Sequence, residues 1–170
     1  MMAQHLKVFG TSHRLQGAEG RDFNIDDPDY SVLIERFLED TDFVFEEGAE
    51  IGPTTAEKLA LSKLGSGFYC DIDPSVERRL KEFGIGETGR SYPIHPCEPD
   101  SGILHYEFSL EQEKREALWL KRIQQWKFSR ALLICGYTHV LSMSFRLRAA
   151  GYDVETTFYM PLAKLCPRLD

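Results

Sequence analysis

The amino-acid sequence predicts an α/β domain, a three-layer sandwich with a mainly parallel central sheet. Short apolar runs without polar alternation, such as residues 43–45 and 132–135, are typical of strands covered on both faces. These runs alternate with longer segments whose apolar residues recur at helical spacing. The chain has 170 residues, of which 42% are hydrophobic, so it can form one domain (residues 1–170) with its own core.

The first third of the chain predicts a strand, a loop and a helix. Residues 5–9 form the strand, which Gly10 ends. Residues 15–27 have no period and are rich in Gly, Asp and Asn, so a surface loop is expected there. A helix over residues 29–38 follows, capped by Asp27 or Asp29. Its predicted apolar face comprises Val32, Leu33, Phe37 and Leu38.

Two further strands with helices after them are predicted up to Gly84. The strand at residues 43–45 precedes a helix over residues 54–64 that Gly65 stops. A strand at residues 68–71 is followed by Asp73-Pro74, which predicts a helix N-cap and first position, with the helix running to Phe83.

The last half begins with a loop over residues 84–102 that is rich in Gly and Pro, long enough to be functional or disordered. A capping-box spacing predicts a long helix over residues 109–127, with Trp119, Ile123 and Trp126 on its core face. The final elements are a strand, a helix, a strand and a tail, at residues 131–135, 139–150, 152–159 and 161–170.

Composition narrows the classes of partner. The net charge is −7, which argues against nucleic acid, and the basic segment 114–130 is expected to be a solvated helix face. No apolar run reaches membrane-spanning length and no signal-peptide core is present, so no membrane partner is expected. The cysteines lack C-x-x-C spacing, which favours a reducing cytoplasm. They are Cys70, Cys97, Cys135 and Cys166.

Two Gly-x-x-His units are the main functional clue. Gly10-Thr11-Ser12-His13 and Gly136-Tyr137-Thr138-His139 each follow a predicted strand. The carboxyl ends of parallel strands share one edge of a sheet, and ligands bind in the crevice there. We therefore expect His13 and His139 to meet at that edge with Glu46 or Glu47, which end another strand. Only one of the two glutamates can face the crevice if side chains alternate.

These residue types suit hydrolytic chemistry with a metal. Two imidazoles and a carboxylate leave an open coordination position where a bound water becomes acidic. The candidate metal ligands and catalytic residues are His13, His139 and Glu47, and the candidate cofactor-binding residues are Gly10, Gly136 and Glu46. We expect the two glycines to turn with positive φ.

Other polar residues have plainer interpretations. Asp71 and Asp73 are expected to serve in a turn and a helix cap. His95, Cys97 and Glu98 are either a lid with extra ligands or a surface loop, and the loop is favoured. Single histidines such as His5 and His105 are treated as structural.

The motifs resemble those of the TIKI/TraB superfamily, which includes ChaN-like and erythromycin-esterase-like proteins. The likeness lies in residues 9–13, 42–48, 136–140 and 147–154, and it is weak between about 50 and 128. It implies an α/β fold with paired Gly-x-x-His motifs and a glutamate in one cleft. By its spacing from Asp42, Glu47 fits the family's acid better than Glu46. Some members are metal-dependent peptidases, others are metal-independent esterases, and ChaN-like members bind haem.

The leading hypothesis is a hydrolase of peptide or ester bonds that uses Mn, Co or Zn. A variant of it has no metal, and a histidine oriented by Glu47 activates water. A second hypothesis is a non-catalytic module that binds haem, a metal or an anion. A third is a partner-binding subunit, and a homodimer is compatible with the tryptophan-bearing helix.

Overall fold

The sheet confirms the predicted α/β class. The computed structural model describes residues 4–17, 25–48, 52–86 and 110–161. Within them, five strands pair in parallel in the order β3-β2-β4-β1-β5. Their bounds are β1 His5–Thr11, β2 Phe43–Glu46, β3 Tyr69–Asp71, β4 Arg130–Gly136 and β5 Asp153–Tyr159.

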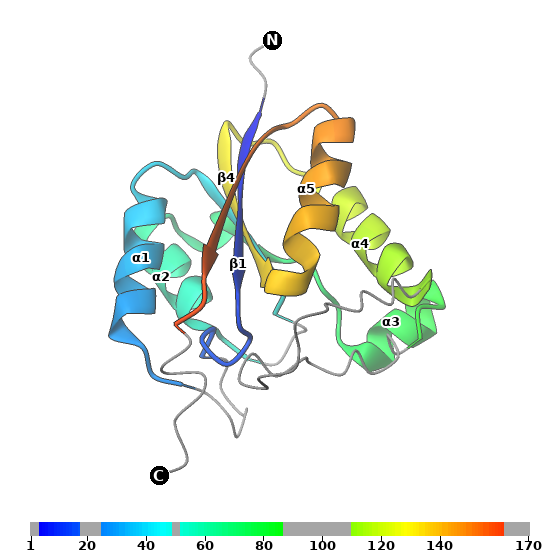
Figure 1. Ribbon diagram of the computed structural model, residues 1–170, viewed down its shortest axis with the longest axis horizontal. Helices are drawn as coiled ribbons and strands as arrows, with labels where there is room; N and C mark the ends of the chain where they lie inside the picture. The colour runs from blue at the N-terminus through cyan, green and yellow to red at the C-terminus, as the bar shows by residue number, and fades with distance from the viewer. Residues whose placement is uncertain (1–3, 18–24, 49–51, 87–109, 162–170) are drawn as a thin grey trace, which may run out of the picture.

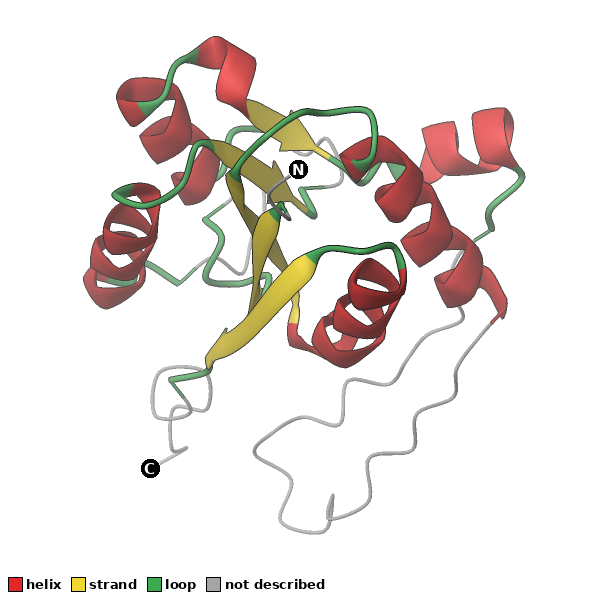
Figure 2. Ribbon diagram, turned by 90° about the horizontal axis from the view of Figure 1, so that it is seen from above, coloured by secondary structure: helices red, strands yellow, loops and turns green. Residues whose placement is uncertain are grey.

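Helices cover both faces of this sheet, which gives the three layers. In Figure 1, α1 and α2 lie on one side, and α3, α4 and α5 lie on the other; Figure 2 shows the same arrangement from above. The α-helices are α1 Pro28–Leu38, α2 Thr55–Lys63, α3 Val76–Phe83, α4 Leu110–Ile123 and α5 Val140–Ala149, and two short 3₁₀ helices are η1 Ser66–Phe68 and η2 Tyr137–His139. Among the residues that the structure describes, no helix has the length and apolar character needed to cross a membrane.

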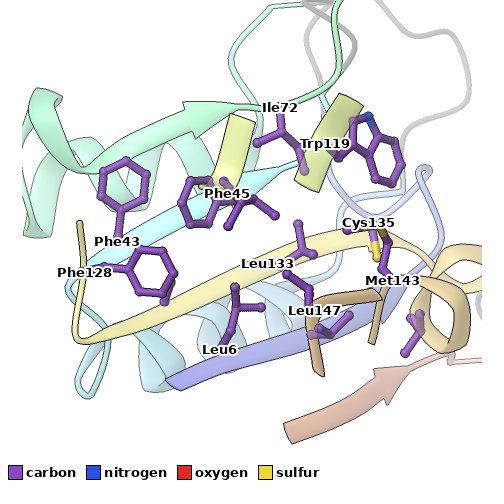
Figure 3. Packing of buried hydrophobic residues seen from close by; sticks show 14 residues of the cluster. Leu6, Phe43, Phe45, Ile72, Trp119, Phe128, Leu133, Cys135, Met143 and Leu147 are labelled. Atoms are coloured by element: carbon purple, nitrogen blue, oxygen red, sulfur yellow. The ribbon is translucent and has the colours of Figure 1, made fainter. Parts of the chain in front are cut away.

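The core consists of two apolar clusters, one on each face of the sheet. Leu133 and Cys135 of β4 point into the cluster beneath α4 and α5, whereas Leu132 and Ile134 point into the cluster beneath α1 and α2. Figure 3 shows the first cluster, with Trp119 of α4 against the sheet. Each fully buried large apolar side chain contributes roughly 1.5–3 kcal/mol. Burial on both faces explains why the strands lack polar alternation.

The crossovers place a topological switch point between β1 and β4. The chain leaves β1 toward α1 on one face and leaves β4 through η2 into α5 on the other, as their core contacts show. β1 and β4 are neighbours over their whole length, from His5 beside Arg130 to Thr11 beside Gly136. A crevice at the carboxyl edge is expected where neighbouring connections diverge in this way.

Several local predictions need correction. Val32, which was expected on the buried face of α1, is 56% exposed. The other three predicted residues do face the core, Leu38 buried and Leu33 and Phe37 partly buried, and Tyr30 and Ile34 complete the buried face. Of the two caps expected for α1, Asp27 and Asp29, the N-cap is Asp27, whose side chain accepts a hydrogen bond from the Asp29 N–H. The long helix α4 ends at Ile123, so Trp126 lies beyond it and is 38% exposed, although its ring contacts Phe43.

The predicted loops are described only in part. Leu15 and Gln16 are buried rather than on the surface, and residues 18–24 lie outside the described residues. The same holds for residues 87–109 and 162–170, which contain most of the predicted loop 84–102 and of the tail 161–170. His95, Cys97, Glu98 and His105 therefore lie outside the described residues.

Candidate active site

The structure brings His13, Glu47 and His139 together at the carboxyl edge of the sheet. Each follows the end of a different strand, β1, β2 and β4 respectively. Nε2 of His13 lies 3.6 Å from Oε1 of Glu47, and Nε2 of His139 lies 3.7 Å from the same oxygen. The two imidazoles and the carboxylate, remote in sequence, thus converge on one point.

Strand alternation decides which glutamate faces the histidines. Glu46 is the last residue of β2, and Glu47 follows it with its backbone N–H still bonded to the Ile134 carbonyl of β4. Successive residues of an extended chain point to opposite faces. Glu47 consequently faces α4 and the histidines, whereas Glu46 faces the beginning of α2. Both side chains are buried.

Glu47 is a buried anion with strong partners. Arg115 Nη2 lies 2.5 Å from Oε1, and the Gly136 N–H donates to Oε2 at 2.8 Å. Burial alone would raise the pKa of Glu47. The positive charge of Arg115, the neighbouring His13 and His139 and the Gly136 N–H outweigh it, and the pKa is lowered to about 2. Glu47 is therefore ionised at neutral pH.

Arg115 is held in place by Asp73. The guanidinium of Arg115 and the carboxylate of Asp73 form a bidentate pair. Arg115 Nε donates a hydrogen bond to Asp73 Oδ1 at 2.9 Å, and Arg115 Nη2 donates one to Asp73 Oδ2. Trp119 Nε1 donates to Asp73 Oδ1 at 3.0 Å, and Arg79 Nη1 lies 3.5 Å from it. Such fork-like pairing fixes both position and direction of the guanidinium.

These contacts correct two predictions. Asp73 does not cap a helix, because α3 begins three residues later at Val76 and the Asp73 carboxylate is engaged by α4. Arg115 belongs to the site rather than to a solvated face. Its spacing four residues before Trp119 puts both on one side of the helix, which is the signal that could have revealed it. Asp71 accepts from the Gly48 and Asp73 N–H groups, as its predicted role in a turn requires.

His139 is buried and held through its other ring nitrogen. Nδ1 lies 2.9 Å from Glu116 Oε1, which also accepts from the Ser142 hydroxyl at 2.6 Å. Arg146 Nε donates to Glu116 Oε2 at 3.1 Å, and the Trp119 ring lies against the imidazole, 4.8 Å between centroids. Burial would raise the pKa of Glu116, but the hydrogen bonds from His139 and Ser142 lower it. Glu116 was not predicted as a site residue.

His13 is the accessible histidine of the pair. Its side chain is 41% exposed, against 7% for that of His139. Nδ1 of His13 lies 2.7 Å from the Gln16 side-chain oxygen, which leaves Nε2 on the side of Glu47. A group that must exchange protons with a substrate or with water requires this access.

The two motif glycines provide space and not the positive φ that we expected. Gly10 and Gly136 are absent from the described glycines with left-handed φ, and Gly136 has φ −55°. A Cβ on Gly136 would lie 2.8 Å from His13 Nε2, and one on Gly10 would lie 2.4 Å from Val140 Cγ2. A side chain at position 136 would therefore displace the His13 imidazole from its present place.

Substitution of this glycine tests the close approach. We expect Gly136→Ala to displace the His13 ring and to reduce any activity that depends on it by about tenfold or more. Gly67→Ala is the matched control, because nothing lies within 4 Å of its added Cβ. Equal effects of the two substitutions on the ring signals of His13 in NMR spectra would contradict this account.

The donor set fits a metal ion only in part. Each imidazole has an Nδ1 partner and directs Nε2 at the same point, as in many metal sites. The Arg115 guanidinium, however, already pairs with the shared Glu47 oxygen, and its positive charge opposes a cation there. In the described part of the chain, no three His, Cys, Asp or Glu side chains form a group that could hold a metal ion.

In comparisons with known proteins, no family model, no curated protein and no solved structure matches this chain. The likeness to the TIKI/TraB superfamily therefore stays a prediction from the motifs. His5, treated as structural, lies at the opposite end of β1 with Asp153 and Glu155.

Proposed function

We propose that this protein is a hydrolase of ester or peptide bonds in which His13 acts as a general base on water. The observation that supports it most is the convergence of two imidazole Nε2 atoms, 3.6 and 3.7 Å away, on one carboxylate oxygen that is buried and ionised. These separations are too long for direct hydrogen bonds and leave Nε2 of His13 available to a third group.

The proton follows a short path in this mechanism. His13 Nε2 takes a proton from water as the oxygen attacks the substrate carbonyl carbon, and an anionic tetrahedral intermediate forms. The Glu47 carboxylate stabilises the imidazolium produced beside it. When the bond to the leaving alcohol or amine breaks, His13 returns its proton to that group. His139 and Arg115 lie next to the same oxygen of Glu47, Oε1.

A metal-dependent form of the same hydrolysis is the second candidate. It is favoured by the Nδ1 partners of both histidines, which would leave two Nε2 lone pairs for Mn, Co or Zn. A bound cation would supply Lewis acidity and a more acidic water. We place it second because Arg115 already pairs with Glu47.

A substrate panel with a chelator separates these candidates. The purified full chain would be assayed on p-nitrophenyl esters and on short peptides, before and after EDTA, with metal content measured in parallel. The first candidate predicts turnover that EDTA leaves unchanged, while the second predicts loss with EDTA and recovery with added Mn, Co or Zn. Absence of turnover on every ester and peptide, with or without those metals, would count against hydrolysis and favour a binding module for haem or an anion.

A further inference from the structure

A second buried carboxyl lies behind His13 and is not used in the hydrolytic steps. Glu46 is fully buried and reaches neither His139 nor Arg115 in any described hydrogen bond. Its Oε2 accepts from the Thr54 hydroxyl at 2.5 Å and from the Tyr69 hydroxyl at 2.9 Å. Thr54 is in turn the N-cap of α2 and accepts from the Glu57 N–H. Glu46 is thus fixed between β3 and the beginning of α2.

The other oxygen of Glu46 holds the side chain of Gln16. Gln16 Nε2 lies 3.0 Å from Glu46 Oε1 and 3.3 Å from the backbone carbonyl oxygen of Glu47. When Glu46 is ionised, as it is at the pH of the test below, Glu46 Oε1 and the Glu47 carbonyl oxygen are both acceptors. An amide nitrogen has two hydrogens and can satisfy both, whereas an amide oxygen in that place could satisfy neither. The Gln16 backbone is also fixed, because its carbonyl accepts from the Thr55 N–H at 2.8 Å.

This orientation determines the protonation of His13. With its nitrogen directed at Glu46, Gln16 presents its oxygen to His13 Nδ1 at 2.7 Å. An amide oxygen only accepts, so Nδ1 must carry the hydrogen. A neutral imidazole has a single N–H, and Nε2 is then the unprotonated nitrogen.

We propose that Glu46 and Gln16 are positioning residues that hold neutral His13 in the Nδ1–H tautomer, with the lone pair of Nε2 directed into the site. The chain of contacts runs from Glu46 Oε1 to Gln16 Nε2 and from Gln16 Oε1 to His13 Nδ1. Its value for catalysis rests on the proposed function, since a base with the other tautomer would direct a proton, and not a lone pair, at water.

The tautomer can be measured without any substrate. Ring ¹⁵N shifts from long-range ¹H–¹⁵N spectra of the full chain distinguish Nδ1–H from Nε2–H. Spectra at about pH 9 report the neutral ring of an ordinary histidine, and His13→Ala assigns the His13 signals. We expect Nδ1–H in the wild type. A wild-type ring that is Nε2–H would overturn the proposal at once.

Two variants interrupt the chain at different points. Gln16→Met removes the acceptor at Nδ1, and we expect it to change the tautomer ratio about fivefold or more toward Nε2–H. Glu46→Gln keeps an oxygen for the Thr54 and Tyr69 hydroxyls and places an amide NH₂ opposite Gln16 Nε2. That clash of donors favours rotation of the Gln16 amide, so we expect a shift in the same direction.

Tyr69→Phe is the matched control. It removes a donor to Oε2 of the same carboxyl but leaves Oε1 and Gln16 untouched, and the tautomer should stay as in the wild type. If Gln16→Met leaves the tautomer ratio of His13 unchanged, the proposed chain of contacts through Gln16 does not set the tautomer. If only Glu46→Gln leaves it unchanged, Glu46 has no positioning role. A shift in Tyr69→Phe as large as in Glu46→Gln would mark a general structural effect and also overturn the assignment.

Activity is a separate readout. Where turnover is found, Gln16→Met should lower kcat about tenfold or more with KM little changed, because it alters the base and not the substrate contacts. If the His13 tautomer shifts as expected in the variants but the protein turns over no substrate, the positioning role of Glu46 and Gln16 stands and the hydrolase is excluded. If the protein turns over substrate but the tautomer does not shift in the variants, the hydrolase stands and the positioning role is excluded.

Discussion

Replacing His13 by alanine is expected to lower kcat/KM for ester hydrolysis by about 10²–10⁴-fold. The reason is that His13 is the accessible imidazole, 41% exposed, whose Nε2 faces the ionised Glu47. Initial rates on p-nitrophenyl esters that the wild type turns over would measure the effect.

His5→Ala is the matched control for that experiment. His5 is also half-buried and paired with carboxylates, but it lies at the amino end of β1. Its replacement should leave kcat/KM close to the wild-type value. Equal rates for His13→Ala and His5→Ala would exclude His13 as the base, and circular dichroism would establish that both variants are folded.

The adjacent carboxyls Glu46 and Glu47 should give the unfolding free energy two opposite pH dependences. Burial raises the pKa of Glu46 from 4.5 to about 7, against the hydrogen bonds from Thr54 and Tyr69. The folded protein thus holds this proton more tightly than the unfolded chain, and stability falls as pH rises from 4.5 through 7. The pKa of Glu47 is lowered to about 2, so Glu47 acts in the other direction. Its contribution to stability is present above pH 4.5 and is lost as pH falls toward 2.

Each of these two pKa shifts corresponds to a change of about 3 kcal/mol in the unfolding free energy. Both changes should therefore be measurable by urea unfolding between about pH 3 and 8. The same substitution at neighbouring positions separates them. Relative to the wild type, Glu46→Gln should remove the fall in unfolding free energy as pH rises above 4.5. Glu47→Gln should remove the loss of unfolding free energy as pH falls below 4.5. Parallel profiles for the wild type and Glu46→Gln would show that Glu46 titrates normally.

The sheet was predictable because its strands are buried on both faces, which leaves an uninterrupted apolar run such as that in β4. The meeting of His13, Glu47 and His139 followed from the rule that parallel strands end at one edge. Arg115 and Glu116 were missed because charged residues on an amphipathic helix are usually solvated. The spacing of Arg115 from Trp119 places it on the core side of the helix, but the strand end that it meets there depends on the tertiary fold. Gln16 lay in a segment without periodicity, where side-chain contacts depend entirely on the tertiary fold.

The position of β4 has a consequence for how the nascent chain folds. β1 and β2 do not pair with each other, because β4 is inserted between them, and it is synthesised more than 80 residues after β2 ends at Glu46. Of the described strands, β2 and β3 are the two that can pair until the ribosome has released β4, and their apolar edges stay open to water. We expect slow assembly and dependence on chaperones during translation, as is usual for sheets dominated by distant pairings.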